Sequence, residues 1–141
     1  MMAGYSGTPL GKKLGLRDGV RALLLDVPAH LDEILGFPGF AVLDMAVPDG
    51  TSRVYDYIHV FETDRARLES LVPALRASLN ADGTLWISWP KKASKVPTTV
   101  TEDCLREIFL PVALVDVKVA AVDEVWSGLK FMFRKEVRNS L

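Results

Sequence analysis

The stretch Asp82–Glu102, DGTLWISWPKKASKVPTTVTE, contains a turn, an apolar strand, a basic loop and the start of a helix. The apolar run within 84–89 predicts a buried strand. Lys91, Lys92 and Lys95 follow that strand at once. In α/β proteins, anions bind where the carboxyl end of a strand meets the N-terminus of the next helix. This stretch therefore predicts an α/β fold and a candidate anion site.

Strand-like segments of similar character occur on both sides of this stretch. The expected strands are 20–27, 40–47, 54–61, 84–89, 114–122 and 126–134. The first has a continuous apolar centre, as strands of a parallel sheet covered on both faces do. The last two are separated only by Asp123, Glu124 and Val125, which is too short for a parallel crossover, so they form an antiparallel hairpin.

Helix signals lie between these strands. Thr8 as N-cap and Pro9 as the first helical residue begin a short helix that Gly15 ends. A second short helix is expected to open at Pro28 and stop at Gly36. The glycine-containing arm before the first helix, residues 1–7, is expected to fold over the sheet or over a partner subunit in an oligomer; fraying in solution is the alternative.

Two further helices complete the alternation. Thr63 or Asp64 caps a helix with a clear leucine stripe, in which Pro73 is expected to cause a kink. The segment Thr99–Glu102 fits a capping box, with Thr99 as the cap and Glu102 reaching back to it. Four strands separated by helices, followed by a hairpin, predict an α/β sheet with one antiparallel strand.

Size and composition limit the possible functions. The 141 residues suit one domain, 1–141, and 49% hydrophobic with 25% charged residues is typical of a globular protein. A formal net charge of -1 argues against nucleic acid as a partner. The longest apolar run, residues 108–115, is too short to cross a membrane, and no signal peptide is recognisable. We therefore expect a cytoplasmic protein that makes no membrane contact.

The scarcity of cysteine and histidine predicts that the chain binds no metal and forms no internal disulfide. Cys104 is the single cysteine, and its apolar neighbours predict a buried small hydrophobe. His30 and His59 do not form a metal signature. His59 shares a strand face with Tyr57 and Phe61, where a hydrogen-bonded interior histidine is expected and a base at the site is the alternative.

The order of elements resembles the Rossmann-like fold of S-adenosylmethionine-dependent methyltransferases. The segments LGLRDGVRAL (14–23), YDYI (55–58) and LNADGTL (79–85), together with the terminal hairpin, carry this resemblance. It implies a three-layer sandwich around a mostly parallel six-stranded sheet in the order 2-1-3-4-6-5, one strand and one helix short of the full fold.

The same resemblance argues against the usual cofactor. Those enzymes have a glycine-rich loop after the first strand, where the backbone approaches S-adenosylmethionine closely. Here the corresponding loop, Asp26–His30, has no glycine and contains a proline. We therefore expect no cofactor.

A second resemblance covers nearly the whole chain. The segments GYSGTPLGKKLGL (4–16), WPKKASKVPTTVTED (89–103) and DEVWSGLKF (123–131) are similar to a bacterial family of uncharacterised domains. This resemblance implies no particular activity.

The lysine loop is the strongest candidate site. We expect Lys91, Lys92 and Ser94 to hold a phosphate or carboxylate, with Lys95 alongside and with free backbone N–H groups near Thr99. The alternative is that these lysines only keep an exposed loop soluble.

Other residues are expected to meet this loop at the same edge of the sheet. Asp26 and His30 follow the first strand and form a possible Asp–His pair for proton transfer. Trp89 ends the fourth strand, and Trp126 with Ser127 begins the last one. Trp126 forms a pocket wall or, alternatively, packs at the edge of the core. The carboxylates of Asp123 and Glu124 are expected to point apart into water, with a metal site as the alternative.

Three functions follow from this candidate site. The first is a non-catalytic binding or regulatory module for an anionic small molecule or a protein partner. The second is a small enzyme acting on a phosphorylated or carboxylated substrate, with His30 or Asp26 handling protons. The third is nucleic-acid binding through Lys12, Lys13 and the loop lysines, which the net charge disfavours.

Overall fold

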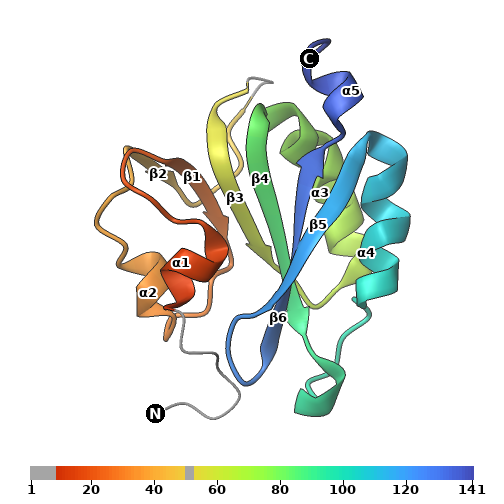
Figure 1. Ribbon diagram of the computed structural model, residues 1–141. Helices are drawn as coiled ribbons and strands as arrows, with labels where there is room; N and C mark the ends of the chain where they lie inside the picture. The colour runs from red at the N-terminus through yellow and green to blue at the C-terminus, as the bar shows by residue number, and fades with distance from the viewer. Residues whose placement is uncertain (1–8, 50–52) are drawn as a thin grey trace.

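The computed structural model describes residues 9–49 and 53–141 (Figure 1). Its strands are β1 (Arg21–Leu25), β2 (Val42–Asp44), β3 (Tyr55–Phe61), β4 (Leu79–Pro90), β5 (Leu114–Ala121) and β6 (Trp126–Phe133). Its helices are α1 (Leu10–Leu14), α2 (Asp32–Leu35), α3 (Arg65–Ser78), η1 (Lys92–Ser94), α4 (Glu102–Phe109), η2 (Leu110–Val112) and α5 (Lys135–Arg138). The expected arm, residues 1–7, and the expected cap Thr8 lie outside the described residues.

One mixed sheet organises the fold. Its strand order is β2-β1-β3-β4-β6-β5, with parallel pairing up to β4 and antiparallel pairing beyond it. This confirms the predicted order and the terminal hairpin. The predicted α/β class with helices on both faces is confirmed as well: α1 and α2 cover one face of the sheet, and α3 and α4 cover the other (Figure 1).

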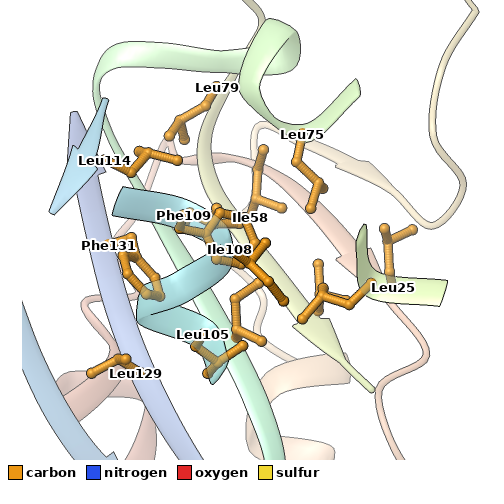
Figure 2. Close-up of a cluster of buried hydrophobic side chains, with 14 of the residues drawn as sticks. Leu25, Ile58, Leu75, Leu79, Leu105, Ile108, Phe109, Leu114, Leu129 and Phe131 are labelled. Carbon is orange, nitrogen blue, oxygen red and sulfur yellow. The ribbon is translucent and has the colours of Figure 1, made fainter. Parts of the chain in front are cut away.

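The larger core lies between the sheet and helices α3 and α4. Alternate residues of the central strands point into it, among them Ile58, Leu85 and Phe131, which are fully buried. Figure 2 shows Ile58 and Phe131 beside Leu105 and Ile108 of α4. The leucine stripe predicted for α3, together with the buried face of α4, thus covers this side of the sheet.

The smaller core lies under α1 and α2. Trp86 is fully buried there, and its indole Nε1 donates a hydrogen bond to the carbonyl oxygen of Leu14 in α1 at 3.0 Å. Trp89 belongs to the opposite core, because two residues three positions apart on a strand point to opposite faces of the sheet. Gly15 ends α1 with φ of 81°, a left-handed conformation that glycine adopts without strain.

Several element boundaries differ from the prediction. The segment Asn80–Gly83 was expected to be a turn, but it lies inside β4, whose pairing with β3 shifts register beside it. A Cβ at Gly83 would lie 3.0 Å from the carbonyl oxygen of Tyr55, so the close approach of β3 selects glycine here. Helix α2 starts at Asp32, later than the expected Pro28. The short α5 follows the last strand, in a segment where the sequence shows no helix signal.

The helix caps were predicted in part. Asp64 caps α3 by accepting a hydrogen bond from the N–H of Ala66, which confirms one of the two predicted caps. The expected cap of α4 is wrong: Thr101 accepts from the N–H of Cys104, and the Cys104 Sγ accepts from the N–H of Thr101. Cys104 is 5% exposed, so its predicted burial is confirmed.

Candidate functional site

The candidate residues gather where β1, β3 and β4 end and β6 begins. This edge of the sheet, here called the rim, faces the lower part of Figure 1, with the β5–β6 turn and the loop containing η1. Parallel strands bring the segments after their carboxyl ends together, which is why binding crevices of open α/β sheets form at such edges. The predicted placement of Asp26, His30, Lys91 and Trp126 at one edge follows from this topology.

An Asp–His pair is present at the rim, but the carboxylate is not the one expected. His30 Nε2 lies 2.8 Å from Oδ2 of Asp123 in the β5–β6 turn. No hydrogen bond or ion pair among the described residues joins His30 to Asp26, which is exposed and has φ of 58°. The predicted Asp26–His30 pair is therefore wrong, because the hairpin turn reaches His30 from the far end of the chain.

Asp123 is held firmly in place. Its Oδ1 accepts hydrogen bonds from the backbone N–H groups of Val125 at 2.8 Å and Trp126 at 2.7 Å. Burial alone would raise the pKa of Asp123, but the hydrogen bonds from Trp126, His30 and Val125 outweigh it and lower the pKa below the usual 3.8. Asp123 is buried and Glu124 is exposed, so the expectation that both point into water is wrong for Asp123.

Trp126 closes the rim from the hairpin side. Its ring meets Phe61 edge-on, with 5.2 Å between ring centroids, and packs against the smaller core together with Val27. Of the two predicted roles, packing at the edge of the core is therefore the observed one. Ser127 is half-buried and pairs with Trp89 across the sheet.

The lysine loop is fixed by its own hydrogen bonds. The N–H of Lys91 donates to the carbonyl oxygen of Val125 at 2.8 Å, which ties the loop to the hairpin. The Ser94 hydroxyl donates to the carbonyl oxygen of Lys91 and accepts from the N–H of Val96. Lys92 and Lys95 are exposed and Lys91 is half-buried. Ser94 therefore shapes the loop, while the three lysine side chains remain available to a ligand.

The backbone N–H groups expected to hold an anion already have partners. Those of Thr99, Val100 and Thr101 donate to the Thr63 carbonyl oxygen, the Thr98 hydroxyl and the Cys104 Sγ. The Thr99 Oγ1 accepts from the N–H of Arg65 at the start of α3. The expectation of free N–H groups near Thr99 is thus wrong, because this segment links α4 to α3.

The helix that follows the lysine loop also carries its own negative charge. Glu102 and Asp103 lie in the first turn of α4, and Glu102 is paired with Arg106. Carboxylates at this position already compensate the positive end of the helix dipole. An anion at the rim is therefore left with the lysine side chains as its partners.

Glu62, directly after β3, is a rim residue that the sequence did not single out as a ligand. It is 3% exposed, and its Oε2 accepts from the N–H groups of Thr63 and Asp64. Its Oε1 is the one buried side-chain polar atom without a partner in residues 9–49 and 53–141. The feature of the sequence that could have identified Glu62 as a site residue is its position as an acidic residue directly after a buried strand.

A second polar group is fully enclosed. His59 is 0% exposed; its Nδ1 lies 2.8 Å from the Tyr57 hydroxyl and its Nε2 lies 2.7 Å from the Ser88 Oγ. Burial lowers the pKa of His59 to about 3, so the ring is neutral. The predicted interior, hydrogen-bonded histidine is confirmed. Within the described ranges, no three His, Cys, Asp or Glu side chains come together as a possible metal site.

Comparison with solved structures identifies the class of fold. A S-adenosylmethionine-dependent methyltransferase from Aquifex aeolicus aligns over 87% of this chain and 87% of its own, with a TM-score of 0.62 and 16% identity. A TehB-like S-adenosylmethionine-dependent methyltransferase from Corynebacterium glutamicum aligns over 94% of this chain and 91% of its own, with a TM-score of 0.60 and 14% identity. A putative type 11 methyltransferase from Sulfolobus solfataricus aligns over 89% of this chain and 90% of its own, with a TM-score of 0.57 and 14% identity.

The chain therefore has the Rossmann-like fold of S-adenosylmethionine-dependent methyltransferases, as the sequence predicted. No protein-family model matches the chain, and no curated protein has a similar sequence. The resemblance to an uncharacterised bacterial family stays a prediction. Every helix that the structure describes is too short or too polar to cross a membrane.

Proposed function

We propose that the chain is a non-catalytic binding module built on the methyltransferase fold. Its ligand is a small molecule with a phosphate or carboxylate group, held by Lys91, Lys92 and Lys95. The observation that carries this proposal is the closure of the rim, where the loop after β1 is joined to the β5–β6 turn by the His30–Asp123 contact.

The closure argues against S-adenosylmethionine as the ligand. The loop after β1 contains Pro28 and no glycine, so it cannot offer the close backbone approach that the resembling enzymes use. Phe61 and Trp126 pack together beside it. The His30–Asp123 contact engages the loop after β1, whereas Trp126 pairs with Pro90, the residue just before the lysine loop.

The lysine loop supplies the charge for an anion. Among the described residues, no carboxylate lies within 4.0 Å of the Nζ atoms of Lys91, Lys92 or Lys95, since the ion pairs are made elsewhere. Lysine is a common phosphate ligand and acts there as a mobile point charge. The tether from Lys91 to Val125 limits the motion of the loop and so lowers the entropic cost of binding.

A thermal-shift series tests this proposal. Phosphate, citrate and nucleoside monophosphates are added to the parent chain and to Lys91→Glu/Lys92→Glu at matched ionic strength. A ligand at about ten times its Kd stabilises the folded state by about 1.4 kcal/mol, which raises the melting midpoint by about 4 °C. We expect one or more of these anions to raise the midpoint of the parent chain and not that of the double variant.

The control is Lys12→Glu/Lys135→Glu, which makes the same charge change at two exposed lysines outside the rim. It should respond to the anions as the parent chain does. Equal shifts in the parent chain and the rim variant, or no shift in the parent chain, would contradict the rim as an anion site.

A second candidate is an enzyme acting on the same kind of substrate, and the His30–Asp123 pair favours it. The His30 side chain is 65% exposed and that of Asp123 is 10% exposed. When Nε2–H donates to the carboxylate, Nδ1 is left as an acceptor that can take a proton from a substrate. A buried carboxylate that orients an exposed imidazole is the arrangement a general base requires.

Hydrolysis of p-nitrophenyl acetate reports whether the His30 imidazole is reactive, either as a base or as a nucleophile. In that case the second-order rate should fall about tenfold or more in His30→Ala, since His59 is buried and does not contribute. The rate should also fall in Asp123→Asn, and it should be unchanged in the control Lys135→Glu. Unchanged hydrolysis in His30→Ala would leave the binding module as the proposed function.

A further inference from the structure

Four basic side chains gather on the sheet face that α1 covers, away from the lysine loop. Lys13 lies in α1, Arg17 follows it, and Lys118 and Lys130 lie on β5 and β6. We call these four the basic cluster. Lys13 Nζ donates to the carbonyl oxygen of Ala121 at 2.8 Å, and Lys118 Nζ donates to the carbonyl oxygen of Lys13 at 3.3 Å. These contacts bring α1 and the hairpin together.

A β-bulge creates the centre of the basic cluster. Leu114 to Asp116 pair with β6 in one register, and Lys118 to Ala121 pair in a register shifted by one residue. Val117 is the extra residue. Without it, Lys118 would point to the opposite face of the sheet; with it, Lys118 stands directly opposite Lys130. The bulge therefore places two like charges side by side.

This arrangement costs stability in the chain alone. Like charges directly opposite one another on neighbouring strands are destabilising. Burial lowers the pKa of Lys130, and the charges of Lys118 and Arg17 lower it further, so three cations of the cluster act on one another.

No carboxylate of the described residues forms an ion pair with the basic cluster. None of the four cations has an acidic group within 4.0 Å among residues 9–49 and 53–141, where every ion pair lies elsewhere. Asp18, the neighbour of Arg17 in the chain, lies against Gly39 instead. Residues 1–8 and 50–52 contain no Asp or Glu. The chain therefore supplies no ion-pair partner to the basic cluster, which leaves its charges to water or to a ligand.

We propose that the basic cluster binds phosphate groups of a multiply charged ligand, either a small polyphosphate or the backbone of a nucleic acid strand. Phosphate matches the donors: each lysine ammonium contacts it as a point charge, and the guanidinium of Arg17 can bind two of its oxygens. A singly charged carboxylate would leave most of the repulsion among the four cations. This proposal does not depend on the function proposed for the rim.

Lys118→Glu separates a binding role from a structural one. It replaces the like-charge pair with a Glu–Lys pair across the strands and removes only the long, exposed hydrogen bond from Lys118 to Lys13, so the melting midpoint without ligand should show a net rise of about 2 °C. Calorimetry with sodium tripolyphosphate at constant ionic strength should show that the same variant loses about tenfold or more in affinity. Lys130→Gln should also lose affinity. If Lys118 had only a structural role, its replacement would not raise the stability of the chain while lowering its affinity for tripolyphosphate.

The control is Lys135→Glu, an exposed lysine of α5, which should bind tripolyphosphate as the parent chain does. Anisotropy of a labelled single-stranded oligonucleotide identifies the source of the phosphate. If the oligonucleotide binds, a plot of the logarithm of its affinity against the logarithm of the salt concentration should have a slope of about −3, as expected for four phosphate contacts. Binding of tripolyphosphate alone indicates a small ligand. The proposal fails if neither probe binds, or if Lys118→Glu binds like the parent chain.

Discussion

Replacing Trp86 with alanine is expected to lower the free energy of unfolding by about 3–5 kcal/mol. Trp86 is fully buried in the core beneath α1, and its indole N–H is the hydrogen bond that joins the sheet to Leu14. A Cβ at Gly128 would lie only 3.1 Å from the indole ring, so the β6 backbone lies directly against the ring. Removing the ring leaves a cavity that neither α1 nor β6 can fill without moving.

Such a loss is a large part of the stability of an ordinary domain, about 5–15 kcal/mol. Urea unfolding followed by circular dichroism measures it. Trp86→Phe serves as the matched control, since it keeps an aromatic ring and loses the N–H donor; its cost should be about 1–3 kcal/mol. A cost below about 1 kcal/mol for Trp86→Ala would show that α1 is not held to the sheet through this side chain.

Lowering the pH from 7 to 5 is expected to remove about 2 kcal/mol of stability through His59 alone. In the folded chain the pKa of His59 is lowered to about 3 by burial, whereas in the unfolded chain it is near 6.5. Below pH 6.5 the unfolded chain therefore binds a proton that the folded chain does not. Stability falls as the pH falls, and the loss continues until the pH reaches the folded-state pKa.

The neutral ring satisfies both of its contacts, since Nδ1 can accept from the Tyr57 hydroxyl while Nε2 donates to Ser88. His59→Gln removes the titration and keeps an amide that can donate and accept. Its stability at pH 7 should be lower than that of the parent chain, and its decline between pH 7 and pH 5 should be smaller by about 2 kcal/mol. Parallel pH profiles for the two chains would contradict a neutral, buried His59.

Much of the fold could be predicted because local patterns agree with it. The three-residue gap Asp123–Val125 requires a hairpin, and the spacing of Trp86 and Trp89 puts them on opposite faces. The bulge at Val117 could not be predicted, since it depends on how β5 pairs with β6 and leaves no mark in the strand pattern. The position of the α4 cap was missed because Thr99 and Thr101 offer the same hydroxyl two residues apart.

The site could be predicted only in outline. The topology placed His30 and the lysine loop at the rim, yet His30 and Asp123 are 93 residues apart in the chain, and nothing in either segment specifies the pairing. The backbone N–H groups near Thr99 are not free because this segment contacts Thr63 and Arg65 at the start of α3, which the local sequence does not reveal. The basic cluster was missed because it combines residues of α1, β5 and β6.

We propose that this methyltransferase-like fold lacks a crevice for S-adenosylmethionine, and calorimetric titration with S-adenosylmethionine tests that proposal most directly. The loop Asp26–His30 has no glycine, and the His30–Asp123 and Phe61–Trp126 contacts close the rim beside it. We predict no heat beyond dilution with S-adenosylmethionine at up to about 1 mM, a concentration that would reveal binding of about −4 kcal/mol or stronger. Saturable binding with a micromolar Kd would contradict the claim.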